Sequence, residues 1–330
     1  CNFSSWEQVL PFTKDEIWNN QEKNVAGWAD HLEFMDGSLE NMVSICTQAG
    51  KVADSDARFS ISGTQAPTAY GGMDWWRQMK VFDGLMNYYV GGQHELQRSF
   101  RPDGEYMPWE FGYSSKGGVL GYKIWKTLFL GYRGIMGFHY PSLVNPDWSL
   151  SKNMSDALPY LQVLSDGMGK HYLNNLQAKS NIAILYSQAS IRAAFIEKRR
   201  DEHRLLREKL IAIMRHIGAN FDFISYEQLA EGILIDRAYE TLILPDSSAL
   251  SDNEIQEVIS FANSGNKIIA IGIPGRRKQN CAIREKNDLH ALFKNSNNVL
   301  IDNINVDYME ALAYPEKKEN YDLLLQEQME

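Results

Sequence analysis

Short apolar segments of strand length alternate with helix-length segments along most of this 330-residue chain. The first half contains four such strand segments, at 58–63, 85–90, 105–111 and 134–140. The segments between them have the length or the periodicity of helices. Strands that alternate with crossover helices are typical of a parallel sheet, so the pattern predicts an α/β fold.

The second half repeats this alternation more regularly. Its apolar strands are expected at 181–186, 221–225, 241–245, 267–272 and 299–303. Amphipathic helices are predicted over 201–217 and 252–264, and the second is capped by Ser251 or Asp252 and stopped by Gly265. This half therefore reads as a doubly wound α/β domain.

The longest predicted helix covers 28–49, and Gly50 is expected to end it. Its apolar residues recur at spacings of three and four, and they are Leu32, Met35, Leu39, Met42 and Cys46. We expect this face to be buried, with Cys46 as a small core residue.

The bulk composition excludes several classes of ligand. The formal net charge of −9 argues against an electrostatic grip on nucleic acid or on an anionic membrane surface. No apolar run reaches the ~18 residues that a membrane span needs. The cysteines Cys1, Cys46 and Cys281 form no metal-spaced pair, and no glycine-rich cofactor loop is present, so we expect neither a metal nor a cofactor.

Aromatic residues are concentrated in the first half, where all eight tryptophans lie. Sugar rings stack on aromatic planes, so this half suits a carbohydrate site. Trp75 and Trp76 follow a Gly-Gly turn, and Tyr88 and Tyr89 end a predicted strand. For one of the two tryptophans, a position in the core is an equally good explanation.

Glu110 is the best candidate for a catalytic carboxylate. It ends a predicted strand beside Trp109, and retaining glycosidases need an ionised nucleophilic carboxylate of this kind. Glu95 is a rival, although Glu95 and His94 read more simply as a loop pair in solvent. His139 ends the fourth strand, at the edge where barrel enzymes carry their active sites, and could contact a substrate.

Four segments occur in an order that is found in a known family. Residues 5–11 read Ser-Trp-Glu-Gln-Val-Leu-Pro, and residues 28–31, Trp-Ala-Asp-His, lead into Phe-Met at 34–35. Residues 62–65 read Ser-Gly-Thr-Gln at a strand end. Together with the region 181–303, these segments resemble glycoside hydrolase family 42 β-galactosidases over nearly the whole chain.

The resemblance implies a (β/α)8 barrel of which this chain holds strands 5–8. Residues 5–11 match the segment after the fourth strand of that family, which makes 58–63 the fifth strand. The strand with Glu110 is then the seventh, where the family carries its nucleophile. The acid/base Glu of the family follows the fourth strand and would lie upstream of Cys1.

The resemblance also implies a domain organisation. Residues 1–175 would be the C-terminal half of the catalytic barrel, and 176–305 a flavodoxin-like trimerisation domain related to class I amidotransferases. Residues 306–330 would be a tail or the start of a further region. A homotrimer, an oligosaccharide or glycoside substrate and a bacterial cytoplasmic or periplasmic location are the matching expectations, without a cofactor, nucleic acid or membrane partner.

These observations predict a retaining hydrolase of terminal non-reducing β-glycosides in the intact parent protein. Glu110 would be the nucleophile, and Trp75, Trp76, Tyr88, Tyr89, Trp109 and His139 would line the sugar site. The alternative is a non-catalytic carbohydrate-binding or oligomerisation protein with a degenerate barrel. An amidotransferase or redox role lacks both a nucleophile at a strand–helix elbow and a cofactor loop.

Overall fold

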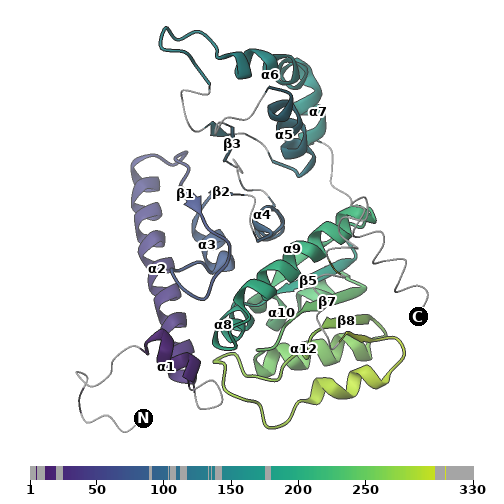
Figure 1. The fold of residues 1–330 in the computed structure, drawn as a ribbon. Helices are drawn as coiled ribbons and strands as arrows, with labels where there is room; N and C mark the ends of the chain where they lie inside the picture. The colour runs from purple at the N-terminus through teal and green to yellow at the C-terminus, as the bar shows by residue number, and fades with distance from the viewer. Residues whose placement is uncertain are drawn as a thin grey trace. The chain divides into compact units, whose positions relative to one another are not determined.

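The computed structural model describes residue 5 and the stretches 12–19, 25–88, 91–102, 104, 109–111, 117–132, 134, 136–137, 143–174, 180–301 and 309. Side chains are not described at 63, 64, 87, 109–111, 117, 136 and 137. The chain divides into two compact units (Figure 1). The first unit comprises Cys1–Leu39, Pro67–Asp74 and Ser180–Glu330, and the second comprises Glu40–Ala66 and Trp75–Lys179.

Two pairs of parallel strands lie in the second unit. β1 (Ser60–Thr64) pairs with β2 (Gly84–Asn87), and β3 (Trp109–Phe111) pairs with β4 (Met136–Gly137). The register shifts once within each pair. Parallel strands joined through helices confirm the predicted α/β class.

A helix follows each of these strands. They are α3 (Trp75–Val81), α4 (Gln93–Phe100), α5 (Gly117–Phe129) and α6 (Lys152–Val163). Leu120 and Ile124 of α5 pack against Ala157 of α6, and these three side chains form a small buried cluster. The alternation predicted for this half is therefore present in the structure.

The last helical stretch of the second unit is interrupted. α6 runs into a π-helical segment, η3 (Leu164–Met168), and then into α7 (Gly169–Asn174). Gly167 inside η3 has φ 122 and is not helical. The apolar pattern of the sequence predicts one continuous helix over 157–171, and this prediction is wrong because a glycine in this conformation breaks the repeating geometry.

Helix α2 (Ala26–Ala53) is longer than predicted and passes through Gly50. A Cβ atom at Gly50 would lie 2.1 Å from Cζ of the Phe59 ring. Glycine at this point thus permits a ring to approach the helix closely and does not end the helix.

The buried face of α2 also differs from the prediction. Leu32 is buried, but Met35, Met42 and Cys46 are exposed. The helix instead buries Trp28. The sequence pattern alone could not separate two apolar faces that share one helix, so the wrong residues were assigned to the core.

A five-stranded parallel sheet forms the centre of the first unit. Its strand order is β6-β5-β7-β8-β9. The strands are β5 (Ile182–Tyr186), β6 (Asp222–Ser225), β7 (Thr241–Pro245), β8 (Lys267–Ile271) and β9 (Val299–Ile301). They lie within the five segments predicted for this half.

Helices connect the strands of this sheet in both directions. α8 (Gln188–Ile196) and α9 (Arg200–His216) lead from β5 to β6. α10 (Tyr226–Ala230) and α11 (Ile233–Asp236) lead back to β7, and α12 (Asp252–Asn263) leads on to β8. Right-handed crossovers that move in opposite directions place their helices on opposite faces of a sheet. A 3-10 segment, η4 (Asp288–Lys294), precedes β9, and the short helix α1 (Lys14–Asn19) also belongs to this unit.

Local sequence signals explain where two of these helices begin. Ser251 accepts a hydrogen bond from the Glu254 N–H, and the Glu254 side chain accepts one from the Ser251 N–H. Ser225 and Gln228 form the same capping box at α10. The box satisfies two backbone donors that a helix start leaves open, which confirms Ser251 as the predicted cap.

Candidate active site

The carboxyl ends of the four short strands are where a barrel-type site would be built. Glu110 is the middle residue of β3, between Trp109, which is registered with Met136, and Phe111, which is registered with Gly137. The backbone therefore places Glu110 in a parallel strand pair, as expected. Its side chain lies outside the described residues.

The Trp75–Trp76 pair divides between two environments. Trp75 is 1% exposed, and its indole N–H donates a hydrogen bond to the Gln65 carbonyl at 3.1 Å. Trp75 is thus a core residue that closes the loop between β1 and α3. Trp76 is half-buried, with its ring edge-to-face against Phe100 at 5.3 Å, and it keeps part of its surface open.

The remaining predicted site residues are described in part. Tyr88 follows β2 and is half-buried. Trp109 is described by its backbone alone, in β3. Tyr89 and His139 lie outside the described residues.

Glu95 and His94 are not a loop pair in solvent. Both belong to helix α4 and are buried, and the His94 ring lies 4.5 Å from the Tyr132 ring. Residue Gly92 starts this helix in a left-handed conformation. The interpretation of this stretch as a solvated loop was wrong because its burial depends on contacts with residues far along the chain.

One carboxylate of the second unit has a structural role. Asp83 accepts a hydrogen bond from the Phe59 N–H at 2.9 Å and pairs with Lys51 and Arg101. Burial acts to raise the pKa of Asp83, but the Phe59 hydrogen bond and the two cations together hold it below the usual value. A carboxylate held ionised in this way ties α2, β1 and β2 together.

A charged network that the sequence did not predict lies in the first unit. Asp246 directly follows β7, is 2% exposed and has φ 46, which is unusual for a residue with a side chain. Its carboxylate accepts hydrogen bonds from Arg199 at 2.9 and 3.3 Å. Arg199 also pairs with Glu197, which pairs in turn with Arg276 and Arg277.

From the sequence alone, Arg276 and Arg277 follow a predicted strand and are interpreted as a turn with surface charge, and the network corrects this interpretation. Arg277 is buried, and its guanidinium also donates to the Cys281 carbonyl at 2.9 Å. Burial raises the pKa of Asp246, and burial with the nearby cations Arg207 and Arg199 lowers the pKa of His203 to about 3. Both carboxylates of the network, Asp246 and Glu197, are thus paired with arginines.

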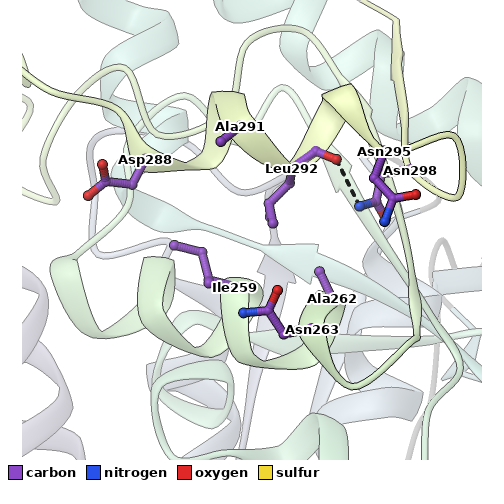
Figure 2. Close-up of a pocket in the computed structure, with 8 residues that line it drawn as sticks. All are labelled: Ile259, Ala262, Asn263, Asp288, Ala291, Leu292, Asn295 and Asn298. Atoms are coloured by element: carbon purple, nitrogen blue, oxygen red, sulfur yellow. Dashed lines mark hydrogen bonds between the residues drawn. The ribbon is translucent and has the colours of Figure 1, made fainter.

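A groove of about 370 Å³ lies between α12 and η4 in the first unit (Figure 2). Its lining mixes apolar side chains with amides and one carboxylate, and comprises Ile259, Ala262, Asn263, Asp288, Ala291, Leu292, Asn295 and Asn298. Asn298 donates to the Leu292 carbonyl at 3.0 Å and accepts from the Ile268 N–H at 2.9 Å, so it holds η4 against β8. The groove has no pair of carboxylates, and none of the predicted sugar-site residues lines it.

Two absences hold for the part of the chain that the structure describes. No group of three or more His, Cys, Asp or Glu side chains there could hold a metal ion. Among the same residues, no helix combines the length and the apolar character needed to cross a membrane.

Comparison with known proteins supports a relationship at the level of the fold. No family model matches the sequence, and no curated protein matches it. Solved structures do match. The β-galactosidase from the psychrophilic Marinomonas ef1 superposes with a TM-score of 0.67 at 13% identity, over 89% of this chain and 51% of its own.

Other structural neighbours agree with this match. The β-galactosidase from Bacillus circulans sp. alkalophilus gives a TM-score of 0.66 at 14% identity, over 88% of this chain and 47% of its own. The family 42 exo-carrageenase from Bacteroides ovatus gives 0.59 at 12% identity, over 91% and 46%. The chain spans about half the length of the structures it resembles, and the likeness is one of fold.

Proposed function

We propose that this chain carries the nucleophile of a retaining glycoside hydrolase that acts on terminal non-reducing β-glycosides, in the manner of β-galactosidases. The observation that carries this proposal is the position of Glu110 in β3, a parallel strand beside β4, within a chain whose fold resembles family 42 enzymes. Under the proposal, β1 to β4 are strands 5–8 of a (β/α)8 barrel, and β3 is the seventh.

The proposed mechanism is a double displacement. The Glu110 carboxylate attacks the anomeric carbon while a second Glu protonates the leaving oxygen. Water then hydrolyses the glycosyl–enzyme ester, and the second Glu acts as the base. The two carboxyl groups must lie about 5 Å apart for this chemistry.

The proposed sugar site uses the remaining aromatic residues of the second unit. In this proposal, the exposed part of the Trp76 ring contacts the sugar. The buried Trp75 fixes the loop that precedes Trp76. Tyr88, Tyr89, Trp109 and His139 complete the site in this proposal. Aromatic faces of this kind suit the C–H faces of a pyranose ring.

The five-stranded sheet is proposed to be a flavodoxin-like, doubly wound domain. Its order β6-β5-β7-β8-β9 is the 2-1-3-4-5 order of such sheets. By the same resemblance this domain would assemble the protein as a homotrimer. Both carboxylates of its charged network are paired with arginines, which supports a structural role for the domain.

The test is the Glu110→Gln variant of the intact protein, assayed on aryl β-galactosides. Removal of a nucleophile should lower the rate at least ~1,000-fold. The matched control is Glu95→Gln, which changes a carboxylate of a helix in the same unit. Product stereochemistry, followed by NMR, should show retention of configuration. Near-normal turnover of Glu110→Gln would end the assignment and leave the non-catalytic carbohydrate-binding alternative.

A further inference from the structure

The carboxyl edge of a parallel α/β sheet is where such folds usually bind their ligands. In the first unit, Tyr186 is the last residue of β5, and Tyr226 is the first residue of α10, directly after β6. Both hydroxyl groups are therefore presented at this edge by neighbouring strands. Tyr186 is 1% exposed, so its hydroxyl is withdrawn from solvent.

The group that meets these hydroxyls is a carboxylate of the same chain. The Tyr226 hydroxyl donates a hydrogen bond to Oδ2 of Asp74 at 2.7 Å. The Tyr186 hydroxyl lies 3.4 Å from Oδ1 of Asp74 and 2.8 Å from Oε1 of Gln188. A phenol has one proton to donate, so Tyr186 can serve either acceptor. Asp74 itself is 1% exposed.

Residues 68–70, a few positions before Asp74, make further contacts within the first unit. The Gln188 side-chain amide, just after β5, donates to the Thr68 carbonyl at 2.7 Å. Ala69 is 2% exposed and belongs to a core cluster of this unit, and the Tyr70 ring lies edge-to-face on Phe195 at 4.9 Å. These contacts all lie within the first unit, and they hold this part of the chain in place.

A buried cation lies close enough to act on the same carboxylate. Arg192 of α8 is 2% exposed and pairs with Asp36 at 2.6 Å and Glu33 at 3.1 Å. Burial acts to lower the pKa of Arg192, but Asp36, Glu33 and Asp74 together hold it above the ordinary value. Asp74 is thus one of the carboxylates that interact electrostatically with Arg192.

We propose that Tyr186 and Tyr226 form a carboxylate-binding site at the carboxyl edge of the sheet, which the chain fills with its own Asp74. The ligand class is a small carboxylate, delivered by an internal segment in place of a diffusible molecule. The inference is independent of the proposed glycosidase activity.

The test is chemical rescue of the full chain. Asp74→Ala removes the carboxylate and leaves space of the size of formate. The lost charge-assisted hydrogen bond should lower the Tm by roughly 5 °C. Sodium formate, compared with sodium chloride at the same ionic strength, should restore at least half of this loss and should saturate. The wild-type chain should show no specific response to formate.

A matched control is available in the same unit. Asp222 accepts a hydrogen bond from the Tyr239 hydroxyl at 3.2 Å, but at the start of β6 and not at the carboxyl edge of the sheet. Asp222→Ala should lose stability without any formate response. An equal formate response in Asp74→Ala, Asp222→Ala and the wild type would overturn the proposal.

A second variant, Tyr226→Phe, tests the proposed carboxylate site if Asp74→Ala does not fold. Tyr226→Phe keeps the ring and removes the hydroxyl. It should lower the Tm and increase amide hydrogen exchange at residues 67–74. Unchanged Tm and exchange in Tyr226→Phe would refute the site. Where Asp74→Ala does fold, combining it with Tyr226→Phe should abolish the formate response.

Discussion

At the scale of single residues, Glu254 is both a helix-capping carboxyl group and a buried side chain. Its carboxylate caps α12 through the Ser251 N–H at 2.7 Å, yet the side chain is buried. Burial raises the pKa of Glu254 to about 7, although the Ser251 hydrogen bonds and Arg284 act to lower it. The folded chain therefore holds a proton on this carboxyl at a pH where the unfolded chain has lost it.

This predicts a loss of stability as the pH rises. The folded pKa lies above the ordinary value of 4.5, so the contribution of Glu254 is fully present below pH 4.5 and is lost as the pH passes through about 7. The difference is on the order of 3 kcal/mol. Glu254→Gln should remove this dependence, as urea unfolding at pH 5 and pH 8 would show. Glu257→Gln, on the same helix, is the control, and a wild-type chain with equal stability at both pH values would contradict the prediction.

Residue-scale predictions from the sequence succeeded where a local rule applied. The cap at Ser251 follows from the first-turn pattern Ser-x-x-Glu, which needs no tertiary information. The burial of Glu95 and the exposure of Cys46 have no local signal. The alternation pattern predicts a strand at Glu110, and the structure has one there, whereas the catalytic role proposed for Glu110 has no such local signal.

At the scale of elements, alanine substitutions at two glycines of α5 are expected to change the stability in opposite directions. A Cβ at Gly118 would meet nothing within 4 Å, whereas a Cβ at Gly121 would lie 2.5 to 2.8 Å from three ring atoms of Tyr160. Gly118→Ala should stabilise the chain by up to about 1 kcal/mol through helix propensity. Gly121→Ala should cost roughly 1–3 kcal/mol because α6 must move. Chemical denaturation measures both, and a stabilising Gly121→Ala would show that Tyr160 does not pack on α5.

Elements were predicted well where apolar periodicity was strong. The five strands of the sheet and the helices α9 and α12 lie close to their expected positions. The errors occurred where glycine had two possible roles. Gly265, at φ 90, does end α12, but Gly50 lies within α2 because it makes room for Phe59. The sequence around a glycine does not show whether the glycine ends a helix or makes room for a neighbouring side chain.

At the scale of the whole molecule, the first unit is assembled from three separate stretches of the chain. Trp28 of α2 stacks on Phe195 of α8 with ring centroids 5.6 Å apart, and the Trp18 indole N–H donates to the Phe195 carbonyl. Contacts between residues so distant in sequence leave no periodic signal in either segment. For this reason the contribution of the early helices to the sheet unit could not be predicted from the sequence.

The same contacts predict how a shorter chain behaves. A fragment of residues 180–330 lacks Asp36 and Trp28, which leaves Arg192 without a buried partner and exposes the apolar face of α8. Removing one member of a buried ion pair typically costs about 3–5 kcal/mol. The fragment should therefore unfold at a lower urea concentration than the sheet unit in the full chain and bind a dye specific for apolar surfaces. A peptide of residues 12–39, added in excess, should raise the midpoint, and a scrambled peptide should not. A fragment with the same midpoint as the full chain would mean that the early helices contribute nothing to the stability of the sheet.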